Sequence, residues 1–278
     1  MRCATNNSGR LRRCHRVWLA REHCRSTILL NHCLLILYLF FNSAVIRAHA
    51  VEGKLSEAAL QAAAHAEERF KKTPDDPQAA WQFGRTCFDL ADFSTNNAER
   101  QAIAEEGLAA CRQALTRESN SAPARYYLAL NMGQLARTKS LGALKLVSEM
   151  ERELLRAIEL DPRFDYAGPE RTLGLLYRDA PALLSIGNRA KSRQYLQRAV
   201  ELVPNYPDNR LSLIESELKW NDRVGAAKDI KLLDELWPNA KREFSGTEWN
   251  HNWEDWNIRL QEAKRKLESP ARLDTPRH

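Results

Sequence analysis

Histidine and cysteine are scarce in this chain beyond its N-terminal segment, and neither occurs in a pattern typical of catalysis. After residue 50 these residues are His65, His251, His278, Cys87 and Cys111. His65 with Glu68, and His251 with Glu254, have helical i,i+3 spacing, but two ligands do not make a metal site. The sequence contains no glycine-rich phosphate loop, nucleophile elbow or zinc-spaced Cys/His cluster. We therefore predict a non-enzymatic protein without a metal site or a cofactor.

Excess positive charge is also missing from most of the chain. Of the 42 Lys and Arg residues, eight lie in residues 1–50 beside a single acid, Glu22. The formal net charge of residues 51–278 is therefore about −1. No basic stripe with interleaved aromatic residues follows, so we do not expect a nucleic-acid partner.

The N-terminal 50 residues have the features of an export signal. An Arg-rich start precedes an apolar run, Ile28 to Phe41, and then Ala48-His49-Ala50, which has small residues at the positions that a signal peptidase recognises. We predict a signal peptide that is cleaved after Ala50. The alternative is an uncleaved membrane anchor, Ile28 to Ile46, and only this anchor would bring the chain to a membrane. Both alternatives place the rest of the chain outside the cytoplasm, in the periplasm or at the cell envelope.

Three prolines indicate a helical repeat. Pro162, Pro204 and Pro238 each follow a segment with an aliphatic residue eight positions earlier and an inward-packing residue five positions earlier, and the last two lie 34 residues apart. This period is typical of the tetratricopeptide repeat, in which helix pairs stack because no pair buries its own apolar face. The pattern predicts helices that end at these prolines.

The first helices of the repeats support this prediction. Leu173, Gly174 and Tyr177 match the consensus best, and weaker matches bring the count to four repeats. Extra residues separate the two helices of the first three repeats. We expect Asn97 to Glu106 and Lys139 to Ser148 to lengthen helices, because both segments lack proline and are rich in helix formers.

The two ends of the repeat region should be covered by capping helices. An Ala-rich helix is expected from about Ser56 to Phe70. At the other end, Thr247 is a candidate N-cap for a helix with one apolar stripe. The stripe comprises Trp249, Trp253, Trp256, Leu260, Ala263 and Leu267. The alternative for these tryptophans is an aromatic ligand box.

The domain prediction is a leader at 1–50, an all-α tetratricopeptide-type α-solenoid of about four helix pairs at 51–268, and a disordered tail at 269–278.

Three stretches give a more specific resemblance over roughly residues 55 to 240. They are Trp81 to Phe88, Tyr126 to Ala136, and Tyr177 to Pro181 with Ser185-Ile186-Gly187-Asn188. They resemble the long-helix repeat proteins that serve as T components of TRAP-type transporters, and the related regulator of microtubule dynamics family. The resemblance implies a repeat protein that binds a partner or hands over a ligand.

A concave groove lined by the first helices of the repeats is the expected binding surface. The candidate residues are Trp81, Arg85, Tyr126, Asn131, Gln134, Arg171 and Arg178. Arginines beside aromatic rings suit a peptide, an acidic segment or a small anionic ligand, because guanidinium pairs with carboxylate. The structural alternative is that Trp81 and Tyr126 are core, and that Arg171 and Arg178 pair with Asp179 or Glu170.

The leading functional hypothesis is a protein–protein interaction scaffold of the cell envelope or periplasm. The alternative is a ligand-handover T component of a TRAP-type organic-acid transporter.

Cys87 and Cys111 fall at inward positions of the first repeat, where they are either buried free thiols or a disulfide that joins the two helices.

Overall fold

The computed structural model describes residues 57–139 and 142–269, which belong to one compact unit, Gly53–His278. The predictions for the leader and for residues 270–278 of the tail lie outside the described residues. None of the helices in these two ranges is long and apolar enough to cross a membrane.

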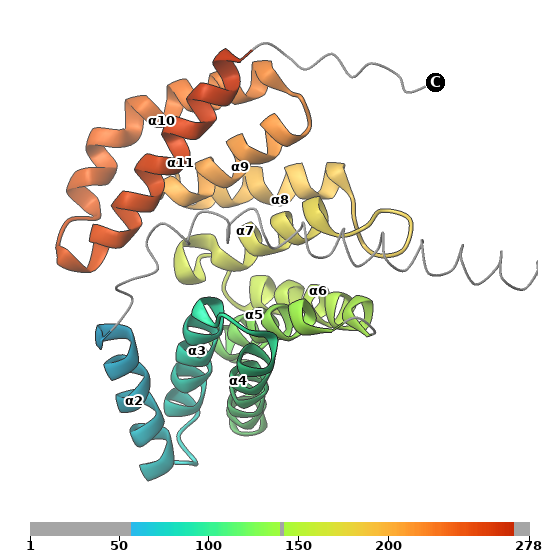
Figure 1. Cartoon of the computed structure of the whole chain (residues 1–278), viewed down its shortest axis with the longest axis vertical. Coiled ribbons are helices and arrows are strands. Elements are labelled where there is room, and N and C mark those ends of the chain that lie inside the picture. The colour runs from blue at the N-terminus through green and yellow to red at the C-terminus, as the bar shows by residue number, and fades with distance from the viewer. Residues whose placement is uncertain (1–56, 140–141, 270–278) are drawn as a thin grey trace, which may run out of the picture. The chain divides into compact units, whose positions relative to one another are not determined.

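The described residues form consecutive α-helices (Figure 1). They are α2 (Glu57–Lys72), α3 (Pro77–Phe93), α4 (Asn97–Arg117), α5 (Ala122–Thr138), α6 (Ala143–Leu160), α7 (Phe164–Asp179), α8 (Arg189–Leu202), α9 (Pro207–Lys219), α10 (Arg223–Glu243) and α11 (Asn250–Glu268). Each packs against its neighbours along the chain, and α3, α5, α7 and α9 also contact one another in order. The four predicted pairs, which are α3/α4, α5/α6, α7/α8 and α9/α10, and both flanking helices are therefore confirmed. The first helix of each pair is called helix A below, and the second helix B.

Glycine permits the closest approach between helices in the first pair. A Cβ atom on Gly84 would lie 2.3 Å from the Cys111 sulfur of α4. The carbonyl of Gly84 also accepts a 2.8 Å hydrogen bond from Nδ2 of Asn131 on α5. A larger residue at position 84 would separate three helices, which explains the small residue that the repeat pattern requires here.

The prediction that Asn97 to Glu106 and Lys139 to Ser148 lengthen helices is confirmed for the first segment and partly wrong for the second. Asn97 to Glu106 forms the start of α4, whose cap is Asn96, which accepts from the amide of Glu99 at 2.9 Å. In the second segment, Lys139 is the C-cap that follows α5, and Gly142 precedes α6 with a φ of 83°. Among the described residues of this segment, Ala143 to Ser148 is helical, and the left-handed backbone at Gly142 places the start of α6 after it.

The proline prediction fails at one position of three. Pro162 and Pro204 follow the ends of α6 and α8 as predicted, whereas Pro238 lies inside α10. The helix continues because Ala240 and Phe244, beyond the proline, are buried in the C-terminal core. This packing offsets the backbone hydrogen bond that proline removes.

The C-terminal stripe packs as a capping helix. Trp256, Leu260 and Ala263 are buried, and α11 contacts both α9 and α10. Thr247 is not the N-cap: it begins a short 3₁₀ helix, Thr247–Trp249, and α11 starts at Asn250 without a side-chain cap. The burial of Trp256 instead anchors this end of the helix.

Candidate functional site

The turn that enters α7 has an unusual backbone. Asp165, Tyr166 and Ala167 have φ values of 50°, 56° and 62°, in the left-handed region that L-residues rarely adopt. Such conformations cost about 1–3 kcal/mol each and persist only where the surroundings hold them. The turn is held from both sides: Phe164 packs against Tyr126 on α5, and Tyr166 stacks on Tyr206 with ring centroids 4.5 Å apart.

Phe164 completes an aromatic surface on α3 and α5. The rings of Trp81 and Tyr127 stack 5.9 Å apart, and Phe164 lies edge-on to both, at 6.4 and 6.1 Å. Tyr127 is buried, whereas Trp81 and Phe164 are half-buried. The guanidinium of Arg85 lies over the Tyr127 ring at 5.9 Å and is more than half exposed.

A carboxylate lies beside this arginine. Nε of Arg85 is 3.8 Å from Oδ2 of Asp89, one helical turn further along α3. Burial raises the pKa of Asp89 to about 6, and the nearby carboxylates of Asp165 and Asp92 add to this effect against the opposing charge of Arg85. The residues Trp81, Arg85, Asp89, Tyr127 and Phe164 are called the α3–α5 patch below. The patch combines apolar rings with one exposed cation and one carboxylate that would gain from another positive charge.

Five of the predicted groove residues lie on α3 and α5, and the first four of them do not share one environment. Trp81 and Arg85 belong to the α3–α5 patch. Tyr126 is buried next to it, with its hydroxyl 3.4 Å from the Thr172 hydroxyl of α7. Asn131 is fully buried, and its amide bonds the carbonyl of Gly84, so its role is helix packing rather than a groove surface.

Three further groove candidates are polar residues that already have partners. Gln134 on α5 is buried and donates to Asp92 at 3.1 Å. Arg178 pairs with Asp179 at 2.6 Å, as the structural alternative predicted. Arg171 pairs with neither Asp179 nor Glu170. Its partners, on α9, are described next.

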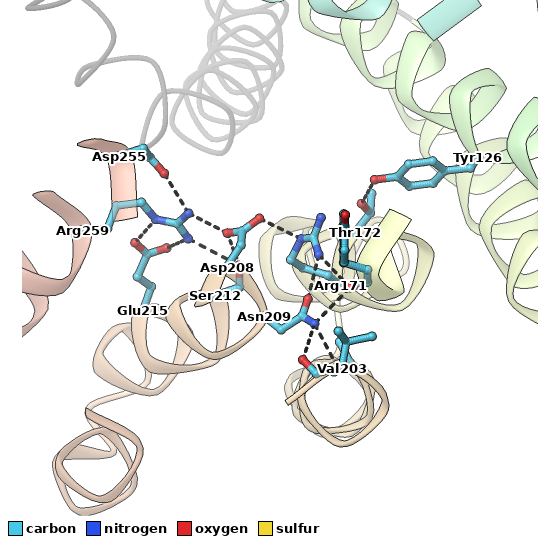
Figure 2. Close-up of polar contacts among 12 residues, drawn as sticks. Tyr126, Arg171, Thr172, Val203, Asp208, Asn209, Ser212, Glu215, Asp255 and Arg259 are labelled. Atoms are coloured by element: carbon cyan, nitrogen blue, oxygen red, sulfur yellow. Dashed lines mark hydrogen bonds and ion pairs between the residues drawn. The ribbon is translucent and has the colours of Figure 1, made fainter. Parts of the chain in front are cut away.

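Arg171 belongs to a buried polar network that the sequence did not reveal (Figure 2). Its Nε lies 3.1 Å from Oδ2 of Asp208, and its Nη1 donates to Asn209 at 2.7 Å. Oδ1 of Asp208 accepts from Arg259 of α11 at 2.6 Å, and Arg259 also pairs with Glu215 at 2.9 Å. Burial opposes ionisation of Asp208, but the two guanidinium groups outweigh it and lower the pKa of this carboxyl. The network fastens α7, α9 and α11 together, so its charges are used internally.

Cys87 and Cys111 are buried free thiols in the structure. The disulfide alternative is therefore not formed. Burial raises the pKa of the Cys87 thiol to about 12, and it raises the pKa of Cys111 as well. Both side chains act as small apolar residues in the contact between α3 and α4.

A second surface feature is a depression of about 650 Å³ on α5 and α6. Its charged lining residues pair with one another: Arg125 lies 2.7 Å from Glu153, and Arg156 lies 2.8 Å from Glu159. It contains none of the predicted site residues. The α3–α5 patch therefore remains the candidate site.

Comparison with known proteins agrees with this architecture. The structure of TTC0263, a thermophilic TPR protein of Thermus thermophilus, matches with a TM-score of 0.53 and 19% identity over 82% of this chain and 97% of that chain. This chain has a tetratricopeptide-repeat fold. Two crystal structures of MamA match with TM-scores of 0.46, at 16% identity over 64% of this chain and 87% of that chain, and at 15% identity over 76% and 97%.

A family model described as regulator of microtubule dynamics protein 1-3 matches residues 47–167 of the tetratricopeptide-repeat chain, which is under half of its length. This match agrees with the resemblance inferred from the sequence. The curated proteins compared with the chain contained no match. The resemblance to TRAP transporter T components stays a prediction.

Proposed function

We propose that this tetratricopeptide-repeat protein is a non-enzymatic interaction scaffold that binds a segment of a partner polypeptide on the α3–α5 patch. The observation that carries the proposal is the half-buried Trp81 ring, which lies in one surface with Arg85 and Asp89. Tryptophan and arginine are the residues most often found at the energetic centre of protein interfaces.

The mixed charge of the patch favours a polypeptide over a small organic acid. Arg85 forms one long ion pair, from its Nε to Asp89 at 3.8 Å, and its side chain is more than half exposed, so a partner carboxylate can also reach it. Asp89, with its raised pKa, would gain from a partner Lys or Arg. A peptide supplies both charges and an apolar side chain for Trp81, whereas an organic acid supplies only one sign of charge.

No observation favours the transporter alternative. The cations that would bind an organic acid, Arg171 and Arg178, are paired with Asp208 and Asp179, and the side chain of each is only 10% exposed. Releasing either arginine would remove one of the two cations that pair with a largely buried carboxylate, which is costly.

We place the scaffold outside the cytoplasm, in the periplasm or at the cell envelope, on the basis of its leader sequence. The test is N-terminal sequencing of the protein purified from its native host. A chain that begins at Val51 is expected. An intact leader in the membrane fraction would instead support the anchor from Ile28 to Ile46.

Panning of a random peptide library on the wild-type protein tests the binding function. The dissociation constants of enriched peptides are then measured against Arg85→Glu and Trp81→Leu. Arg152→Glu is the matched control, because Arg152 is an exposed arginine on α6 that also lies beside a carboxylate, Glu153. Each patch variant should weaken binding about 30-fold or more, which corresponds to about 2 kcal/mol, and the control should bind as the wild type does.

The same experiment can reject the proposal in two ways. If no peptide is enriched, the binding function is wrong. If enriched peptides bind all variants equally, the site is elsewhere on the protein. Circular dichroism melting of each variant ensures that a weaker interaction does not come from unfolding.

A further inference from the structure

The connection between α7 and α8 exposes two leucines. Leu183 is 98% exposed and Leu184 is 56% exposed, in the yellow loop that joins the two helices in Figure 1. Scattered single apolar side chains are ordinary on protein surfaces, whereas these two leucines are adjacent and are exposed together in one loop.

The loop has a fixed conformation that keeps these leucines in solvent. The amide of Ser185 donates to the carbonyl of Pro181 at 2.9 Å, and the amide of Asn188 donates to the carbonyl of Tyr177 at 2.8 Å. Ile186 packs into the core between these bonds. A Cβ atom on Gly187 would lie 1.9 Å from the carbonyl oxygen of Ala180, so this position requires glycine. The two leucines are therefore presented outward by an ordered turn.

Positive charge surrounds the two leucines. Residues 180–200 contain four basic residues and no acidic residue, but Arg193 pairs with Glu217 and Asp222, and Arg198 pairs with Glu170. The positive charge next to the leucines therefore comes from the other two, Arg189 and Lys191. Arg189 and Lys191 lie in the first turn of α8, where the helix dipole favours carboxylates instead. Both are exposed, and aromatic rings hold them: Arg189 lies 5.3 Å from the ring centre of Trp220, and Lys191 lies 4.9 Å from that of Tyr177.

The other connections from helix A to helix B also carry exposed apolar side chains, although the first turn of α4 contains an acidic residue, Glu99. Neighbouring helices run in opposite directions, so all four connections lie on one edge of the array. Among the described residues, five of the eight exposed large apolar side chains lie in or next to these connections: Phe93, Leu144, Leu183, Leu184 and Val224. The first turns of α6 and α10, like that of α8, contain no acidic residue, and they contain Lys145 and Arg223. Asp222 caps α10, however, and Arg223 donates to backbone carbonyls at the end of α11.

We propose that this edge, led by Leu183 and Leu184, docks on the surface of an anionic lipid bilayer. Apolar tips at several connections suit shallow insertion, since a bilayer needs no complementary groove. The basic residues beside the tips complement anionic headgroups. The edge is separate from the peptide-binding function proposed above, which uses the α3–α5 patch, so either proposal can fail without the other.

The test places an environment-sensitive fluorescent amino acid at position 183 of the full-length protein, and at Ile258 in a second sample. Ile258 is an exposed apolar residue on α11, away from the four connections. The probes are vesicles of phosphatidylcholine alone and of phosphatidylcholine mixed with phosphatidylglycerol. The label at 183 should shift to the blue with the anionic vesicles only, and the label at 258 should not shift.

A pair of charge variants tests the electrostatic part. Arg189→Gln with Lys191→Gln should raise the vesicle concentration for a half-maximal shift by about 30-fold, at about 1 kcal/mol for each cation. The matched control is Lys71→Gln with Lys72→Gln, two exposed lysines on α2 with the same loss of charge. The control should behave as the wild type does.

Three outcomes would overturn the proposal. The first is a fluorescence signal from position 183 that does not change when the full-length protein is bound to vesicles. Such a result would mean that the leader, and not this edge, binds the membrane. The second is an equal shift on vesicles without phosphatidylglycerol. The third is a charge variant that matches its control.

Discussion

Nε of Arg171 lies 3.1 Å from Oδ2 of Asp208 and so connects the third repeat to the fourth. The other carboxylate oxygen of Asp208 accepts from Arg259 at 2.6 Å, so one carboxylate joins α7, α9 and α11. Asn209, the next residue, donates to the carbonyl of Tyr166 at 3.0 Å. The strained turn at the start of α7 is therefore fixed by the same network that attaches the capping helix.

Replacing Asp208 by Asn should destabilise the protein strongly. The change leaves Arg171 and Arg259 buried without this counter-charge, and breaking a buried ion pair costs about 3–5 kcal/mol. Chemical denaturation at neutral pH measures the change in the free energy of unfolding. Asp75→Asn is the control, because Asp75 pairs with Arg117 on the surface, where such pairs contribute about 1 kcal/mol or less. A loss no larger than that of the control would contradict the structural role of Asp208.

Asp208 should also make the stability of the protein depend on pH, with a loss of stability in acid. The folded state lowers the pKa of Asp208, so its contribution is fully present above the ordinary value of 3.8. The contribution is lost as the pH falls through the lower value of the folded state. The unfolding free energy of the wild type should therefore fall more steeply below about pH 4 than that of Asp208→Asn. Parallel acid profiles would contradict this assignment.

The sequence predicted the helices well because each helix depends on local information. The apolar period, the small residue at Gly84 and the prolines after α6 and α8 are all visible within a single repeat. Pro238 misled the prediction because burial of Phe244, a long-range contact, outweighs the local effect of proline.

The candidate site was only partly predictable for the same reason. The repeat register placed Trp81 and Arg85 on one face of α3, where the structure has Trp81 half-buried and Arg85 exposed. The partner of Arg171 is 37 residues further along the chain, at Asp208, and no spacing rule links the two. Phe164 and Asp165 were missed because a left-handed turn, rather than a helix, places them beside α3 and α5.

Glu217 should make the protein less stable as the pH rises toward neutral. It is almost fully buried, and burial with the nearby Asp229 raises its pKa from 4.5 to about 7, against the attraction of Arg193. The folded state therefore holds its proton more tightly than the unfolded state, and stability falls between these two pH values. Glu217→Gln should flatten this part of a thermal-melting profile recorded against pH. Glu159→Gln, a change at an exposed residue of α6, is the control for the loss of one carboxylate. A profile of Glu217→Gln that matches the wild type would count against the prediction.

The two buried thiols should be protected from reagents in the folded protein. Burial raises the pKa of Cys87 and of Cys111, and only the thiolate reacts at an appreciable rate. Alkylation followed by peptide mapping should label neither cysteine in native protein, and both after denaturation without a reductant. A peptide pair that stays cross-linked without reductant would show that the disulfide forms after all.

Removing the Trp256 side chain should show how much the capping helix contributes. Trp256 is 1% exposed and packs against Tyr206 and Phe244, with ring centroids 5.4 and 6.2 Å away. Trp256→Ala should cost about 3–5 kcal/mol, because it removes apolar contacts and leaves a cavity. Ile258→Ala, two residues along the same helix on its exposed side, should change the unfolding free energy by about 0.5 kcal/mol or less.

Truncation after residue 245 extends this test to the whole helix. It removes α11 and the Arg259 partner of Asp208, and it exposes the apolar faces of α9 and α10. We expect aggregation or a large drop in melting temperature, measured by light scattering during thermal unfolding. A soluble truncated protein with unchanged melting would mean that α11 folds independently, and its tryptophans would then need another role, such as the aromatic ligand box.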